Sequence, residues 1–243
     1  MNEQTLQERL SVISTRWTLL RQAHGSRLDA VPAAQERLLE RYGGAVHHYL
    51  LGALHDPALA DDLFQEFALR FLQGDFRRAN PQRGRFRDYL RTALIHLVHD
   101  YHRARQQQPQ SLPTGGDVLA APPVDDAESV QLFLAGWRAE LLERTWKALA
   151  QSNPAYYAVL RLRTQDPELE SAQLAERVEA PLGKGVTAAW VRKTLQRARD
   201  KFAVLLLEEV AQSLETAEPE ALRKELQELD LLKYCREALE RRK

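Results

Sequence analysis

Arginines, aromatic rings and histidines are concentrated in residues 83–106, RGRFRDYLRTALIHLVHDYHRARQ. This stretch contains six arginines, three histidines, three phenylalanine or tyrosine rings and no lysine. A guanidinium group pairs with phosphate and stacks on bases, and an exposed ring can stack on an unpaired base. The residue types therefore suit a nucleic-acid surface, with a metal site and a solvated helix face as the alternatives.

The metal alternative depends on three histidines and one aspartate: His96, His99, His102 and Asp100. The histidines spread over about 120° of a helix that has 3.6 residues per turn, so they do not converge on one point. The chain has no HExxH motif, and its single cysteine, Cys235, leaves neither a cysteine cluster for zinc nor an intramolecular disulfide. We expect no metal and no cofactor, and a solvated face is the better of the two alternatives.

The elements that position this stretch have helical periodicity, with apolar residues three or four positions apart and no strand-like alternation. The repeats are Leu38, Tyr42, Val46 and Leu50; Leu63, Phe67 and Phe71; and Phe86, Leu90, Leu94 and Val98. Asp56–Pro57 and Asn80–Pro81 interrupt the pattern. We therefore predict an all-α fold in which residues 1–105 form a first helical domain.

Residues 106–129 contain four prolines and two glycines and have no sustained apolar period, which is typical of a flexible linker. The helical pattern then resumes, and we predict a second helical domain at 130–212 with a break at Asn153–Pro154. An acidic C-terminal helical extension follows at 213–243, with one charged helix at roughly 217–241. The prediction is thus two helical domains, a linker and an extension.

The second domain has a pattern typical of a helix-turn-helix. Ser171 can cap a short helix at 172–178, and Thr187 can cap a longer one at 188–206. The outer face of the longer helix carries Arg192, Lys193, Gln196, Arg197 and Arg199. Such a helix can enter a major groove, although a solvated basic face is the alternative and the turn at 179–186 is longer than usual.

Charge is unevenly distributed although 34 basic residues balance 34 acidic ones. Between Arg70 and Arg105 there are nine arginines and three aspartates, and between Glu208 and Asp230 there are eight acidic residues and two basic ones. The acidic tail could cover residues 192–201 and compete with DNA. We favour a packing role, through Leu222, Leu226, Leu229 and Leu232/Lys233, with Cys235 as a packing residue.

The first twenty residues have no visible secretory signal, and no apolar run approaches the ~20 residues that span a bilayer. We expect a soluble, cytoplasmic protein without membrane insertion. Neither domain offers a nucleophile–base arrangement, a phosphate-cradling glycine loop or paired catalytic carboxylates. We therefore expect no enzymatic activity and no catalytic residues.

The order of these motifs resembles a sigma factor of bacterial RNA polymerase, of the extracytoplasmic-function (ECF) type. DLFQEFALRFLQ (62–73) is similar to the helix of the family that docks on the polymerase clamp. Residues 83–106 resemble the adjoining stretch that opens DNA and reads the minus-ten element. AQLAERV and TAAWVRKTLQRARDKFAVLL resemble the helix-turn-helix that reads the minus-thirty-five element. TRWTLLRQA and LLLEEVAQSL are similar to a subgroup with a C-terminal extension.

The resemblance implies partners and residues for this chain. The partners would be core RNA polymerase and promoter DNA, and an anti-sigma factor is a further candidate. Polymerase-binding residues would be Asp62, Gln65 and Glu66. Residues that meet the opened minus-ten strand would be Arg83, Arg85, Tyr89, His96, His99, Asp100 and Arg103. Residues at the minus-thirty-five duplex would be Thr187, Arg192, Lys193, Gln196 and Arg197.

Two other functions fit parts of the sequence. A stand-alone helix-turn-helix regulator would use residues 1–105 as a sensor or dimerisation domain and would bind a palindromic operator as a dimer. The concentration of basic residues in the first domain argues mildly against it. A helical scaffold or metal-dependent enzyme built on the histidines would require bound metal.

Overall fold

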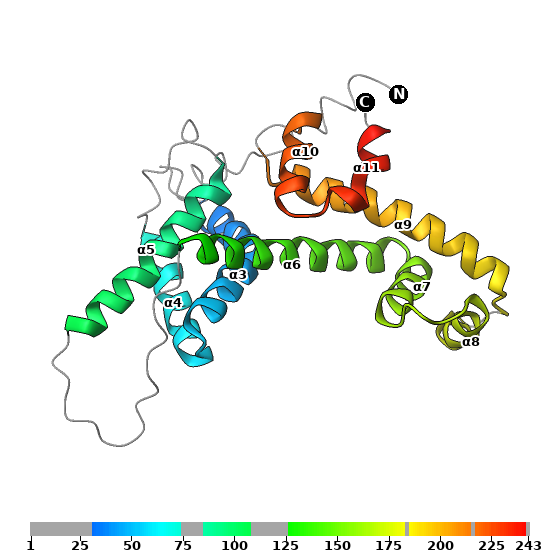
Figure 1. Cartoon of the computed structure of the whole chain (residues 1–243), viewed down its shortest axis with the longest axis horizontal. Helices are drawn as coiled ribbons and strands as arrows, with labels where there is room; N and C mark the ends of the chain where they lie inside the picture. The colour runs from blue at the N-terminus through cyan, green and yellow to red at the C-terminus, as the bar shows by residue number, and fades with distance from the viewer. Residues whose placement is uncertain (1–30, 74–84, 108–125, 183–184, 215–216, 242–243) are drawn as a thin grey trace, which may run out of the picture. The chain divides into compact units, whose positions relative to one another are not determined.

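The computed structural model describes residues 31–73, 85–107, 126–182, 185–214 and 217–241. The predicted all-α fold is confirmed, since every regular element among these residues is a helix (Figure 1). The chain divides into two compact units, residues 1–140 with 213–216 and residues 141–212 with 217–243. The predicted linker lies outside the described residues except at its two ends, which belong to helices.

The first unit is built from α3 (Val31–Leu54), α4 (Pro57–Gln73), α5 (Phe86–Gln107) and the first half of α6 (Asp126–Ser152). The apolar repeats predicted from the sequence form its core, and the aromatic rings interlock there. The Tyr42 ring meets Phe86 of α5 edge-on at 5.1 Å. Burying rings of this size contributes much of the hydrophobic stabilisation of a small helical unit. The core thereby fixes which faces of α4 and α5 remain exposed.

The structure differs from the predicted domain boundary at α6. The sequence assigns this helix to the second domain, but its first half packs antiparallel on α3. The order of the close pairs shows this direction, because Gly44, His48 and Gly52 of α3 meet Glu140, Gly136 and Leu132 of α6. A Cβ atom at Gly136 would lie 3.0 Å from the His48 ring and 3.2 Å from the Ala45 carbonyl oxygen, so a larger residue here would force the two helices or the His48 side chain to shift by a few tenths of an ångström.

The second unit contains the rest of α6, then α7 (Pro154–Gln165), α8 (Ser171–Leu182) and α9 (Ala188–Ala211). The predicted break before α7 is confirmed, since the Asn153 side chain accepts a hydrogen bond from Tyr156 N at 3.0 Å and Pro154 begins the helix. Leu149, Val159, Leu174, Val191 and Leu195 are among the buried residues that join the four helices. The Trp146 ring lies 4.6 Å from Phe202 at the edge of this core.

The C-terminal extension forms two helices, α10 (Pro219–Glu228) and α11 (Leu232–Glu240), instead of the one helix predicted. The chain turns at Asp230, whose φ of 55° lies in the left-handed region. Asp230 N donates to Gln227 O at 3.1 Å and Leu231 N donates to Leu226 O at 2.8 Å. This pair of hydrogen bonds is the Schellman arrangement that ends many helices. Glycine is the usual residue at this position, and the aspartate here gives no clear indication in the sequence that the helix ends.

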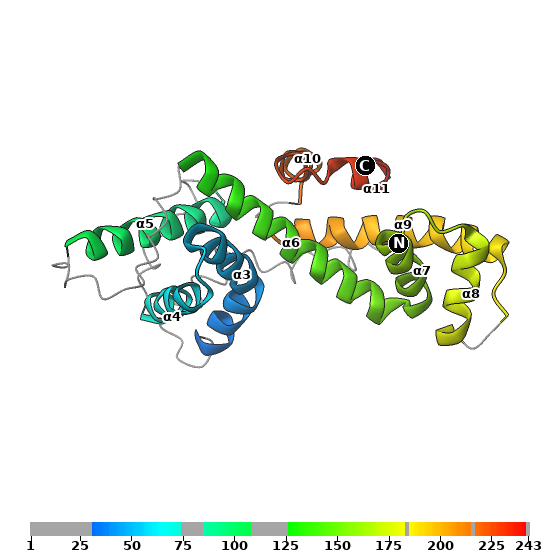
Figure 2. The same cartoon turned by 60° about the horizontal axis from the view of Figure 1, so that its bottom comes forward.

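Both helices of the extension pack on the second half of α9, as Figures 1 and 2 show. Leu222, Leu226 and Leu229 are buried, as the packing prediction requires. Leu232 is half-exposed and Lys233 is exposed, so the prediction was wrong for these two residues. The buried residues on this side are instead Leu231, Cys235 and Leu239. On α9 the matching buried residues are Ala203, Leu206, Leu207 and Val210.

This placement bears on the alternative in which the tail covers the basic residues of α9. Arg192, Lys193 and Arg197 remain exposed while the extension covers the other half of the helix. Arg241 at the end of the extension forms an ion pair with Asp200 of α9, at 3.7 Å. The packing role therefore accounts for the apolar face of the extension.

Candidate nucleic-acid interface

Helix α4 presents its three predicted polymerase-binding residues on one exposed face. Asp62, Gln65 and Glu66 are all exposed, while Leu63, Phe67 and Phe71 on the opposite face are buried. The spacing of three and four residues places them beside one another on the helix surface. Glu66 also forms an ion pair with Arg70, one turn further along.

Two leucines that sequence reasoning missed extend this face. Leu69 is 57% exposed and Leu72 is 45% exposed, whereas most large apolar side chains of the first unit are buried. Leu69 lies three positions beyond Glu66 and four beyond Gln65, and Leu72 lies three beyond Leu69, so acid, amide and leucine side chains follow one another along the helix. The signal in the sequence was an apolar residue outside the 63–67–71 repeat.

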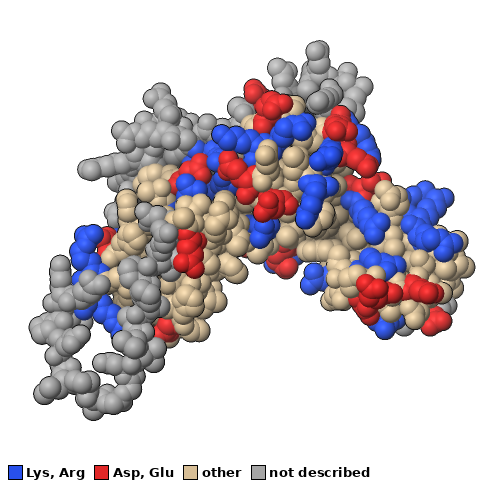
Figure 3. Space-filling model, in the orientation of Figure 1, with Lys and Arg blue, Asp and Glu red and all other residues tan. Residues whose placement is uncertain are grey.

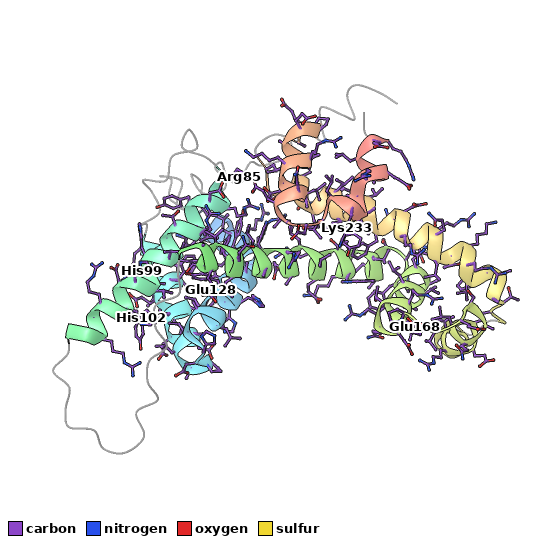
Figure 4. All side chains as sticks on the ribbon, viewed as in Figure 1. Arg85, His99, His102, Glu128, Glu168 and Lys233 are labelled. Carbon is purple, nitrogen blue, oxygen red and sulfur yellow. The ribbon has the colours of Figure 1, made fainter. Side chains whose placement is uncertain are left out.

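Helix α5 gathers most of the predicted minus-ten residues on its exposed side. Tyr89, His96 and Arg103 are seven residues apart, which is close to two helical turns, and Asp100 is four residues from His96. His96, Asp100 and Arg103 are exposed, whereas Tyr89 and His99 are half-buried. Figure 4 shows Arg85 at the start of α5 and His99 and His102 in its second half. Arg83 lies outside the described residues.

The first turn of α5 holds a cluster of arginines around one carboxylate. Arg85 Nε donates to Asp88 Oδ2 at 2.9 Å, and guanidinium nitrogens of Arg87 and Arg91 each lie 3.7 Å from Asp88 Oδ1. Arg87 is only 2% exposed. The basic stretch is therefore not uniformly a surface, because Arg87 belongs to the interior and Asp88 fixes the position of Arg85.

Among the described residues, no group of three or more histidine, cysteine, aspartate or glutamate side chains is arranged to hold a metal ion. Burial lowers the pKa of His102, and electrostatic interactions with His99 and Arg105 lower it further. The lowered pKa favours the neutral form of His102, and a neutral imidazole adds no positive charge to this side of α5.

Helix α9 presents the predicted minus-thirty-five residues in its first half. Thr187 is the N-cap, and its side chain accepts a hydrogen bond from Trp190 N at 3.2 Å. The exposed residues of this half include Arg192, Lys193, Gln196 and Arg197. Figure 3 shows lysine and arginine side chains gathered where Figure 1 places α9. Helix α8 continues to Leu182, beyond the predicted end at Val178, so the turn between the helices is shorter than predicted.

Comparison with known proteins finds one match, and it lies within the first unit. Residues 38–108 match the family model of sigma-70 region 2, which covers most of α3 and all of α4 and α5. Searches of curated proteins and of solved structures give no significant match. None of the described helices has the length and apolar character needed to cross a membrane.

The matched residues include the exposed faces of both α4 and α5. Sigma-70 factors are non-enzymatic transcription factors, and a region 2 domain supports roles in binding RNA polymerase and in melting promoter DNA. The similarity to sigma-70 region 2 is thus carried by residues 38–108, the part of the chain that forms these two helix faces.

Proposed function

We propose that this protein is an ECF-type sigma factor that binds core RNA polymerase, directs it to specific promoters and opens the DNA there. The observation that carries the proposal is the region 2 match over residues 38–108, within which α4 and α5 expose two chemically different faces. One is an acidic and apolar strip and the other is a basic and aromatic strip. These are the two faces that a polymerase-binding and strand-opening domain needs.

The α4 strip is the proposed polymerase-docking surface. The carboxylates of Asp62 and Glu66 and the amide of Gln65 would meet a basic partner surface. The exposed leucines, Leu69 and Leu72, supply apolar area whose removal from water contributes about 25 cal/mol per Å². Charge steers encounter and register, and burial of leucine slows dissociation. The strip thus combines the two contributions that a stable protein interface requires.

The α5 face is the proposed site for the opened minus-ten strand. Unstacking a base costs a few kcal/mol, which stacking on a ring and contacts to phosphate offset. Tyr89 supplies the ring, and Arg85 and Arg103 supply guanidinium groups. His96, His99 and Asp100 can donate to or accept from base edges. Arg83 belongs to the same proposal on sequence grounds.

The second unit is the proposed reader of the minus-thirty-five duplex, with α9 in the major groove. Arg192, Lys193, Gln196 and Arg197 lie on the exposed first half of the helix, and Thr187 caps its start. Balanced charge over the whole chain fits a protein that binds duplex DNA weakly by itself. The polymerase would supply the remaining electrostatic contact, and this partnership would place the protein in the cytoplasm.

The extension formed by α10 and α11 supports assignment to a subgroup with additional C-terminal residues. Its apolar face is occupied by α9, and its outer face carries charged side chains. An anti-sigma factor, if the cell has one, would be a further partner. We propose a packing role for the extension itself.

Transcription reconstituted from purified components tests the proposal. The full chain and core polymerase should initiate RNA from a common motif in a library of random promoters. Initiation that is no different without the protein would contradict the proposed function. Binding of a palindromic operator by a stable dimer without polymerase would favour the helix-turn-helix regulator instead.

A further inference from the structure

An open groove in the second unit is rich in arginine. It lies where α7 and the residues after it meet α9, and its volume is about 680 Å³. The lining residues are Arg163, Thr164, Pro167, Arg192, Leu195 and Arg199. No acidic residue is among them. Three positive charges therefore lie around one hollow.

The charges of the three arginines are not neutralised by carboxylates of the described residues, and one of the three side chains is held in place. Arg163 Nη1 donates to Pro167 O at 2.9 Å and to Leu169 O, which fixes the side chain against the loop after α7. Arg192 and Arg199 are seven residues apart on α9 and share one side of the helix. Among the described residues, no carboxylate forms an ion pair with any of the three. Arg177 of the same unit, in contrast, pairs with Asp166 at 3.4 Å.

The chemistry of the groove selects an anion with several acceptor oxygens. Thr164 Oγ1 already donates to Arg161 O at 2.8 Å, so the arginines are the lining residues whose side chains can donate to an anion. Guanidinium binds phosphate through paired N–H groups, and the charge-assisted bonds are stronger than neutral ones. An anion there would also relieve the repulsion between the arginines.

We propose that this groove binds a phosphate group, supplied either by the backbone of duplex DNA or by a free polyphosphate. The first source rests on the proposed function and is the one the structure favours, because Arg192 belongs both to the groove and to the proposed DNA-reading face. A phosphate held by Arg163 and Arg199 would fix the register of α9 on the duplex. Phosphate contacts position a protein without reading sequence.

The experiment compares wild-type protein, Arg199→Gln and Arg236→Gln. Arg199 and Arg236 are both exposed arginines of the second unit, but Arg236 lies on α11, outside the groove. Binding of a labelled duplex by the full chain is measured over a series of salt concentrations. Arg199→Gln should lower the slope of log K against log salt by about 0.9, the value for one phosphate contact. Affinity should fall about two- to fivefold, as for an exposed ion pair, whereas Arg236→Gln should match wild type.

Binding of tripolyphosphate by the same proteins identifies the source. Lost tripolyphosphate binding in Arg199→Gln with an unchanged DNA slope would assign the groove to a free polyphosphate. If Arg199→Gln and Arg236→Gln have the same salt slope for duplex binding and the same affinity for tripolyphosphate, the proposal is wrong. Arg199→Lys gives a second check, because it should keep the salt slope while weakening binding.

Co-elution of wild-type protein with core polymerase separates this result from the proposed function. If only the groove proposal is wrong, the wild-type protein still co-elutes with core polymerase. If the proposed function is wrong, the wild-type protein does not co-elute, whatever the groove binds.

Discussion

The ring of Trp137 stacks on the ring of Tyr42, with centroids 4.9 Å apart and planes 18° apart. Trp137 lies on α6 and Tyr42 on α3, so the stack joins residues nearly a hundred positions apart in the chain. Trp137 is fully buried there, and Phe133 of the same helix meets Tyr49 of α3 at 6.3 Å. The first half of α6 thus belongs to the same core as residues 38–108, which match sigma-70 region 2.

Trp137→Ala should destabilise the first unit by about 3–5 kcal/mol, because it removes a fully buried ring and leaves a cavity. Thermal and denaturant unfolding followed by circular dichroism measure the change. Gln131→Ala is the matched control, since Gln131 lies on the same helix and is exposed. Equal stability of the two variants would contradict the packing of α6 on α3.

The sequence predicted the faces of α4, α5 and α9 because these depend on local periodicity, which a single helix carries by itself. Caps at Asn153 and Thr187 were predictable for the same reason. The packing of α6 on α3 was not, because a contact between distant segments leaves no local pattern. The burial of Arg87 was also missed, because arginine is ordinarily an exposed residue. The helix break at Asp230 was missed because aspartate by itself does not end a helix.

Leu226→Ala should destabilise the second unit by about 2–5 kcal/mol. Leu226 is fully buried where α10 packs on α9, so the extension is an integral part of the core. Gln227→Ala, at the exposed neighbouring position, is the control. If Leu226→Ala unfolds like wild type but raises DNA binding, the extension is instead a detachable cover.

The free energy of unfolding should decrease at alkaline pH because of the buried thiol of Cys235. Burial raises the pKa of its thiol to about 12 from an ordinary value of 9.0. Above pH 9 the unfolded chain loses the thiol proton while the folded protein keeps it, so the unfolded state gains stability until about pH 12. The free energy of unfolding measured across this range should decline more steeply for wild type than for Cys235→Ala. Parallel curves would show that the thiol is accessible to water.

Leu69→Gln should weaken binding to core polymerase without lowering the thermal stability of the free protein, because the side chain is already 57% exposed. The comparison is Tyr234→Gln, which changes a side chain of similar exposure, 59%, on α11. Affinities come from titration of labelled protein with core polymerase. Similar affinities for the two variants would remove Leu69 from the proposed interface.

Co-elution of the full chain with bacterial core RNA polymerase tests the central claim most directly. The account predicts a stable complex with wild type and loss of that complex with Gln65→Ala/Glu66→Ala, while the double variant keeps its fold because both residues are exposed. Arg236→Gln should co-elute like wild type. Failure of the wild-type protein to bind its cognate core polymerase would contradict the assignment as a sigma factor.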